Sequence, residues 1–483
     1  MATLLLDRRA PARPGWTLAA AVLGFFMITL DALVASIAVP SIRHDLGGGI
    51  TGLQWVLDGY TLMFATLLLS AGALADRVGA RRAFAGGLVV FAVASAACGL
   101  APSLTALVVA RFVQGGSAAV LMPSSMSLIR QEYADPGRRA RAVATWGMGG
   151  AVAASSGPLL GGLLTLVSWR MIFFVNVPAA VAALVLLART GVSPRRSVPF
   201  DGAGQAATVL AMGALTYGAI EAGPAGLTAP RVIWAFGVAL AGLALFLVTQ
   251  ARVAHPMVPR GLFRSRAVPG AMAVGFAFVV GYYGVPFVMS LYLQSVRGLS
   301  PLAAGAAFVP MMALGATLTP LSPRLAARLG GRAMVAGGMV LMTAGLVSLA
   351  VVVAAPGPAA VPVWAVAALM IPVGLAGPLV TPPVTMVLLD SVPAGQAGTA
   401  SGVFNTSRQA GGALAVAVFG ALLAHRATFL AGLRTSLLLA AAVALAAAVA
   451  CLLLLRHLKA GGHTEITLCS PRSPGRFPGK PAR

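Results

Sequence analysis

The stretch Leu74-Ala75-Asp76-Arg77-Val78-Gly79-Ala80-Arg81 returns 251 positions later as Leu325-Ala326-Ala327-Arg328-Leu329-Gly330-Gly331-Arg332. Each copy follows one long apolar stretch and precedes another, which predicts a short loop between two helices in both places. The first copy follows the second apolar stretch of the chain, and the second copy follows the tenth. The repeat therefore has a register of eight helices, which indicates two related bundles with additional helices between them.

The composition around this repeat is that of an integral membrane protein. Hydrophobic residues make up 59% of the 483 residues, whereas charged residues make up 9%. A soluble domain carries roughly 25% charged residues, and one helical membrane crossing uses roughly 20 apolar residues. The apolar stretches leave no room for a separate soluble catalytic domain.

Fourteen apolar windows of about 19 residues are predicted to be transmembrane helices. They lie near 16–40, 51–74, 82–101, 104–129, 140–167, 170–189, 203–221, 231–250, 268–293, 300–322, 333–355, 362–389, 397–424 and 431–455.

The positive charges predict the orientation of these helices. When alternate connections are assigned to one side, 26 of the 34 Lys and Arg residues lie on the side that holds both termini, and 6 lie on the other. Because cytoplasmic loops carry an excess of Lys and Arg, both termini are predicted to be cytoplasmic in the cell (inner) membrane. The net charge of +23 is thereby explained by membrane orientation and membrane lipid, and no nucleic acid is implied.

Two six-helix halves would repeat with a register of six, so a register of eight predicts a 6 + 2 + 6 arrangement. The predicted parts are a cytoplasmic N-terminus (1–15), an N-terminal six-helix bundle (16–190), a linker with two extra transmembrane helices (191–266), a C-terminal six-helix bundle (267–456), and a basic tail that is predicted to be disordered (457–483).

Four motifs make the chain resemble the fourteen-helix drug:proton antiporters of the major facilitator superfamily, especially methylenomycin-resistance-type exporters. They are Leu30-Asp31 through Ala38-Val39-Pro40, Gly72-x-Leu-Ala-Asp76-Arg77-x-Gly79-x-Arg81-Arg82, Arg111-x-x-Gln114-Gly115, and Gly157-Pro158-x-x-Gly161-Gly162. The chain departs from the family pattern at Leu33 and Ser36, where the family usually has Thr and Asn, at Ala153 in place of a glycine, and at Ala327, where the second loop copy lacks the acid of the first.

Three of the charged residues predicted inside the membrane share one depth, and each costs roughly 2.5–3.5 kcal/mol at mid-helix. Asp31, Asp58 and Arg111 all fall roughly 10–14 Å below the outer surface, at 1.5 Å per helical residue. This shared depth predicts a cluster that faces a central cavity and takes up a coupling proton. The resemblance implies the same role for Asp31 and Arg111, and the alternative is a fixed salt bridge that joins helices.

The other motifs suggest gating and packing roles. The resemblance implies that Gly72, Asp76, Arg77, Gly79, Arg81 and Arg82 form a gating loop that links the two halves, the alternative being that these residues only orient the loop. It also implies that Gly157, Pro158, Gly161 and Gly162 mark an exporter, the alternative being ordinary close helix packing. Gln114, Asn405 and Arg408 are candidates for the wall of the cavity.

These features predict a proton-coupled exporter of small amphipathic drugs or antibiotics that works by alternating access as a monomer. Its energy source would be the proton gradient, with no bound cofactor and no metal. An exporter of an endogenous metabolite, amino acid or lipid is the alternative, and a transporter-like membrane sensor is a further one. An enzyme is not indicated, because the sequence shows no nucleophile near a His, no metal cluster and no nucleotide-binding loop.

Overall fold

The computed structural model describes residues 14–191, 193–195, 201–253, 256–353, 361–393, 396–424 and 426–454. Within these ranges the chain is helical throughout and contains no strand. The all-helical membrane fold predicted from the sequence is confirmed. The predicted cytoplasmic N-terminus (1–15), apart from its last two residues, and the predicted basic tail (457–483) lie outside the described residues.

The helices follow one another with short connections. They are α1 (Pro14–Leu46), α2 (Ile50–Val78), α3 (Ala80–Gly99), α4 (Leu104–Glu132), α5 (Pro136–Val167), α6 (Met171–Phe174), α7 (Asn176–Ala188), α8 (Gly202–Ala225), α9 (Pro230–Arg252), α10 (Ala267–Leu291), α11 (Pro301–Ala307), α12 (Val309–Leu318), α13 (Ser322–Leu329), α14 (Gly331–Val353), α15 (Val363–Asp390), α16 (Ala397–Leu422) and α17 (Phe429–Leu454).

Thirteen of the described helical segments are long and apolar enough to cross a membrane. Two of them combine shorter helices: α6 joins α7 across Met171–Ala188, and α11 joins α12 and α13 across Pro301–Leu329. The predicted span near 397–424 forms α16, which is helical but is not among the thirteen. Its middle carries a polar run, Asn405-Thr406-Ser407-Arg408-Gln409. The count of fourteen crossings and the 6 + 2 + 6 division therefore stay predictions.

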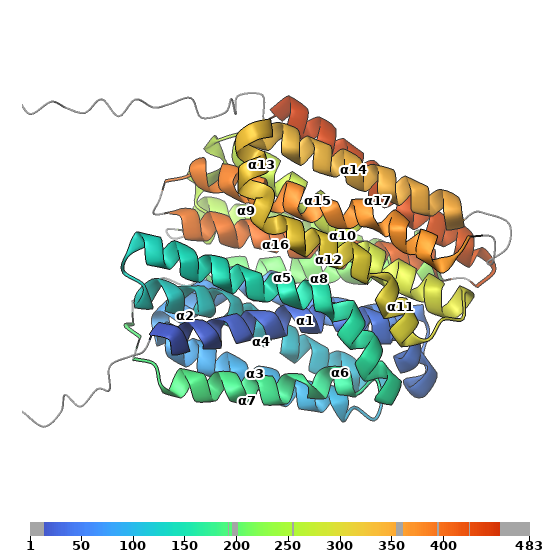
Figure 1. Ribbon diagram of the computed structural model, residues 1–483, viewed down its shortest axis with the longest axis horizontal. Helices are drawn as coiled ribbons and strands as arrows, with labels where there is room; N and C mark the ends of the chain where they lie inside the picture. Colours follow the sequence, from blue (N-terminus) through green and yellow to red (C-terminus); the bar gives the residue numbers. More distant parts are fainter. Residues whose placement is uncertain are drawn as a thin grey trace, which may run out of the picture.

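The helices pack in two groups that lie side by side (Figure 1). Helices α1 to α7 pack on one another, and α10 to α17 form the second group. The groups meet where α2 contacts α16, α5 contacts α11 and α12, and α1 contacts α10. Helix α1 begins and α17 ends at the same end of the molecule (Figure 1), which requires an even number of passes between these two points.

The helices between the groups attach to both of them through α8. At one end of α8, Gln205 Nε2 donates to the carbonyl oxygen of Thr66 on α2 at 2.9 Å, and Ser70 donates to the Gln205 side chain. At its other end, a Cβ on Gly223 would lie 2.6 Å from Ala421 Cα on α16. Helix α9 packs mainly on α8 and leaves much of its apolar surface exposed. The pair α8–α9 thus covers the line along which α2 meets α16.

The repeated motif forms the same turn in both groups. Gly79 has φ +91° between α2 and α3, and Gly330 has φ +80° between α13 and α14. Only glycine adopts this region without a steric penalty, which explains the glycine at this place in each copy. The residues before each glycine belong to the preceding helix. Each connection is therefore shorter than the predicted loop and consists of the glycine alone.

Candidate functional site

Asp31 and Arg111 form an ion pair in the interior of the first group of helices. Arg111 Nη1 on α4 lies 2.5 Å from Asp31 Oδ2 on α1, and both side chains are fully buried. Arg111 Nε donates to the carbonyl oxygen of Val56 on α2 at 2.9 Å. The pair therefore joins three helices of one group. Arg111 is further covered by aromatic rings, with its guanidinium carbon 4.4 Å from the Tyr60 ring centroid and 5.6 Å from that of Phe173.

Amide donors complete the surroundings of the Asp31 carboxylate. Gln114 Nε2 donates to Asp31 Oδ1 at 2.9 Å, and Asn176 Nδ2 on α7 donates to the same oxygen at 2.8 Å. Gln114 and Asn176 also both donate to Ser95 Oγ on α3, at 2.6 and 3.3 Å. Both carboxylate oxygens thus have donors, as a buried charge requires. This arrangement supports the alternative of a salt bridge that joins helices, extended here to α1, α2, α3, α4 and α7.

Asp58 stands apart from this network, which corrects the expectation of a three-residue cluster. It is fully buried on α2, and neither carboxylate oxygen has a hydrogen-bond partner among the described residues. Gln54, four residues earlier on the same face of α2, donates to the carbonyl oxygen of Ala417 on α16 at 2.6 Å. Asp58 therefore lies on the side of α2 that faces the second group of helices, whereas Asp31 and Arg111 lie inside the first.

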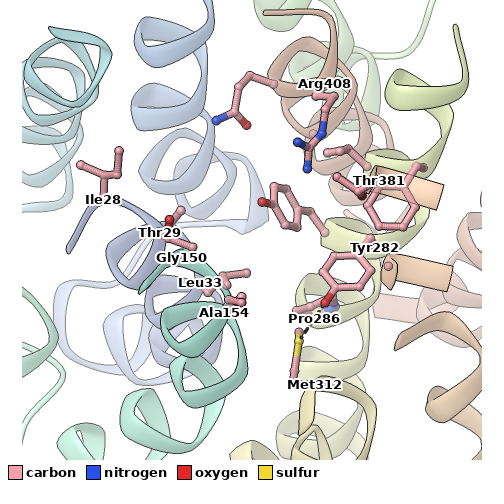
Figure 2. A pocket seen from close by; sticks show the side chains of 18 of the residues that line it. Ile28, Thr29, Leu33, Gly150, Ala154, Tyr282, Pro286, Met312, Thr381 and Arg408 are labelled. Atoms are coloured by element: carbon pink, nitrogen blue, oxygen red, sulfur yellow. Dashed lines mark hydrogen bonds between the residues drawn. The ribbon is translucent and has the colours of Figure 1, made fainter. Parts of the chain in front are cut away.

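A cavity of about 300 Å³ lies between the two groups. Figure 2 shows Ile28, Thr29, Leu33, Gly150 and Ala154 on one wall, and Tyr282, Pro286, Met312, Thr381 and Arg408 on the other. The lining combines aromatic and aliphatic side chains with hydroxyl and amide groups. A site of this kind suits a small amphipathic molecule.

Of the three residues predicted for the cavity wall, the structure places two there. Asn405 and Arg408 line the cavity from α16. Gln114 does not: it is fully buried beside Asp31 because its amide is engaged by Asp31, Ser95 and Arg111. Asp31, Asp58 and Arg111 are also absent from the described lining of this cavity, contrary to the expectation that they face it.

The gating-loop residues lie at the end of the bundle where α2 turns into α3. Arg81 donates through Nε to the carbonyl oxygen of Leu187 and through Nη2 to that of Ala188, both at 3.3 Å, at the carboxyl end of α7. A cation at this position is favourable because a helix carries partial negative charge there. A Cβ on Gly79 would lie 3.1 Å from the carbonyl oxygen of Ser193. Gly72 lies on α2 near Pro123 of α4, Asp76 is half-buried, and Arg82 is exposed. These contacts of Gly72, Gly79 and Arg81 fall within the first half of the chain.

The glycines of α5 bring backbones together in two directions. A Cβ on Gly157 would lie 3.0 Å from Leu33 Cβ, and one on Gly161 would lie 3.2 Å from Val34 Cα, both on α1. On the other side, a Cβ on Gly162 would lie 2.6 Å from the carbonyl oxygen of Pro301 at the start of α11. A Cβ on Gly305 of α11 would likewise lie too close to the carbonyl oxygen of Pro158 on α5. The motif thus packs α5 on its own group and also forms a contact between the groups.

The model of the Major Facilitator Superfamily matches residues 21–416. The chain belongs to the major facilitator superfamily. Its members are transporters, so the expectation that the chain is not an enzyme is confirmed.

Two relatives show the similarity along the chain. A methylenomycin A resistance protein of Streptomyces coelicolor is 33% identical over 85% of this chain and 86% of its own. A tetracenomycin C resistance and export protein of Streptomyces glaucescens is 34% identical over 86% of this chain and 77% of its own. Both support the resemblance to resistance exporters of this superfamily.

The fold is shared with solved transporters at low identity. The crystal structure of a peptide transporter of the POT family in complex with sulfate aligns with a TM-score of 0.70 and 18% identity, over 93% of this chain and 97% of that chain. At this identity the likeness concerns the fold alone.

Several polar residues in the interior of the protein were not predicted from the sequence. Ser95 and Asn176 complete the Asp31 network, and Tyr282 and Tyr283 line the cavity. Asn176 is the only strongly polar side chain in the apolar run 171–188. A buried polar residue needs a partner, so that isolated asparagine was a usable signal.

Replacing Asp31 by Asn is expected to destabilise the protein because it leaves the buried Arg111 guanidinium without a counter-charge. Removing one partner of a buried ion pair costs about 3–5 kcal/mol, whereas a surface pair contributes about 0–1 kcal/mol. Asp45→Asn is the matched control, since Asp45 pairs with Arg170 at the surface. Thermal unfolding of the purified protein in detergent should show a large loss for Asp31→Asn and a small one for Asp45→Asn. Equal losses would contradict the assignment of Asp31 to a helix-joining ion pair.

Gly162→Ala is expected to hold α5 and α11 apart. The added methyl group would collide with backbone at 2.6 Å, which cannot move as a flexible side chain does. A cysteine introduced at Leu302 should then react several-fold faster with a water-soluble maleimide. Gly147→Ala on the same helix is the control, because a Cβ there meets no atom within 4 Å. Unchanged labelling in Gly162→Ala would show that α5 and α11 do not depend on this close contact.

Proposed function

We propose that the protein is a secondary exporter that moves small amphipathic drugs or antibiotics across the cell membrane in exchange for protons. The observation that carries this proposal is the cavity whose walls come from both groups of helices. A site built in this way opens to one side or the other when the groups rock against each other. The names of the relatives, which are resistance and export proteins, support the direction of transport and the class of cargo.

The proposed orientation places both termini and the α2–α3 turn in the cytoplasm of the cell (inner) membrane, following the distribution of Lys and Arg. The contact of Gly162 with Pro301 would then close the outer end of the cavity. The residues around Gly79 would act at the cytoplasmic end as a latch during the opposite half of the cycle. Ala327 replaces the acid in the second copy, so this latch would be asymmetric.

Asp58 is the better of the two candidate carboxyl groups for the coupling proton. Asp31 is held by three side-chain donors, including a guanidinium, so its carboxylate oxygens are already engaged. Asp58 has no donor among the described residues, and burying an ionised carboxylate without one is far more costly than burying the neutral acid. Because Asp58 faces α16 across the boundary between the groups, rocking would change its access to water. Loading and release of a proton would follow from that change.

The remaining partners follow from the same scheme. The proton gradient supplies the energy, so no bound cofactor or metal is needed. The two groups of helices of a single chain enclose the cavity, and we propose that the protein functions as a monomer surrounded by lipid. The positive charge is accounted for by membrane orientation, so we propose no role for nucleic acid.

Asp58→Asn is expected to abolish proton-driven efflux while the protein still folds, because Asn has nearly the same volume as Asp but cannot bind and release a proton. Everted membrane vesicles that carry the wild type should accumulate a fluorescent amphipathic drug, and a protonophore should stop this accumulation. Vesicles with Asp58→Asn should accumulate little drug in either condition.

Asp45→Asn is the matched control, since Asp45 lies at the surface beside Arg170, and it should retain protonophore-sensitive uptake. If the protonophore left drug uptake by wild-type vesicles unchanged, proton coupling would be overturned. Normal uptake by Asp58→Asn would instead assign the coupling proton to another group.

A further inference from the structure

Arg408 is held so that its charged end enters the cavity. Its side chain extends from α16 toward α10. A Cβ on Gly275 of α10 would lie 3.2 Å from Arg408 Cγ. The guanidinium carbon lies 5.8 Å from the centroid of the Phe404 ring. Figure 2 shows the guanidinium pointing into the space between the two walls. The stem of the side chain is thus packed against α10, and the charge is presented to whatever occupies the cavity.

This charge has no counter-ion in the described part of the chain. No ion pair or hydrogen bond of Arg408 is present there, and its Nε atom is buried without a partner. Arg408 is also the one charged side chain among the described residues that line the cavity, which include no Asp, Glu, Lys or His. The buried carboxylate of Asp31 is already engaged by Arg111. A guanidinium placed in such surroundings is stabilised by an anion that offers oxygen acceptors.

The other residues that line the cavity indicate what kind of apolar body the bound anion would have. Tyr282 and Tyr283 line the wall formed by α10, and Phe278 stacks on Tyr282 with ring centroids 5.0 Å apart. Across the cavity, Phe25 stacks on Trp146 at 3.9 Å. Aromatic faces of this kind favour a flat apolar body. A cavity of about 300 Å³ suits a compact one.

We propose that the cavity binds compact amphipathic monoanions, with a flat apolar body and one carboxylate or similarly acidic group, and that Arg408 binds the acidic group. This deepens the proposed function by naming the class of cargo, and it rests on that function only for the direction of movement. Amphipathic cations are disfavoured, because the described lining offers them a like charge and no carboxylate.

A pair of probes that differ only in charge tests the proposal. The purified full-length protein in detergent is titrated with 1-naphthylacetate and with the neutral 1-naphthylacetamide, and binding is followed by calorimetry. We expect the wild type to bind the acid at least about tenfold more tightly than the amide, since a hydrogen-bonded charge contributes about 1.5–3 kcal/mol. Arg408→Gln should lose about tenfold to a hundredfold in affinity for the acid and change little for the amide.

Two further variants keep the test independent of folding. Arg408→Lys keeps the charge and should preserve part of the preference for the acid. Arg231→Gln removes an exposed arginine that pairs with Glu221 and should bind both probes as the wild type does. Equal affinity of the wild type for acid and amide would overturn the proposal, as would an unchanged preference in Arg408→Gln.

Vesicle uptake of the same probes separates this inference from the proposed function. Binding of the acid without protonophore-sensitive uptake would refute proton-driven export and leave the cargo class standing. Protonophore-sensitive uptake of the amide, or of the lipophilic cation tetraphenylphosphonium, in preference to the acid would support export and refute the cargo class.

Discussion

The backbone contact between α5 and α11 is the constraint on which the architecture depends. At Gly162 and Gly305 the two groups of helices approach so closely that no side chain fits between them. Within the membrane, water does not drive helices together, so small residues that allow such close packing supply much of the attraction. The same helix holds α1 through Gly157 and Gly161. Helix α5 is therefore packed firmly on its own group and is in backbone contact with the other group.

Asp31 and Asp58 are both buried carboxyl groups of the first group, but their surroundings differ. Asp31 lies in a network of Arg111, Gln114, Asn176 and Ser95 that joins helices far apart in the sequence. Such a fully satisfied network makes a bundle rigid. Asp58 has no such network among the described residues and lies toward the other group. A rigid half with one unpaired acid among the described residues at its boundary suits the alternating access and protonation that we propose.

Much of the fold could be predicted from the sequence because the membrane imposes simple rules. The apolar stretches predicted helices wherever the described structure has them, and the repeated motif located the turns at Gly79 and Gly330. The rotation of each helix about its axis could not be predicted. Lipid and protein interior are both apolar, so hydrophobic periodicity does not show which face is buried. For this reason the sequence could group Asp58 with Asp31 and Arg111 only by depth. In the structure, Asp58 lies on the face of α2 toward the second group of helices, whereas Asp31 and Arg111 lie inside the first group.

The position of Gln114 shows the same limit, since its place in a motif carried no information about whether it faces the cavity or the interior. From the sequence, Arg408 could be assigned to the wall only as one candidate among others. That it has no counter-ion among the described residues could be seen only in the structure. That lack has a consequence for the energetics of the cycle. In the proposed scheme, the empty cavity carries the charge of Arg408 and a bound anion would cancel it, so filling the cavity would change the charge that moves when the two groups of helices rock. Moving one full charge through 100 mV corresponds to about 2.3 kcal/mol. The rate at which the carrier resets, and with it the turnover, would then depend on the electrical state of the membrane.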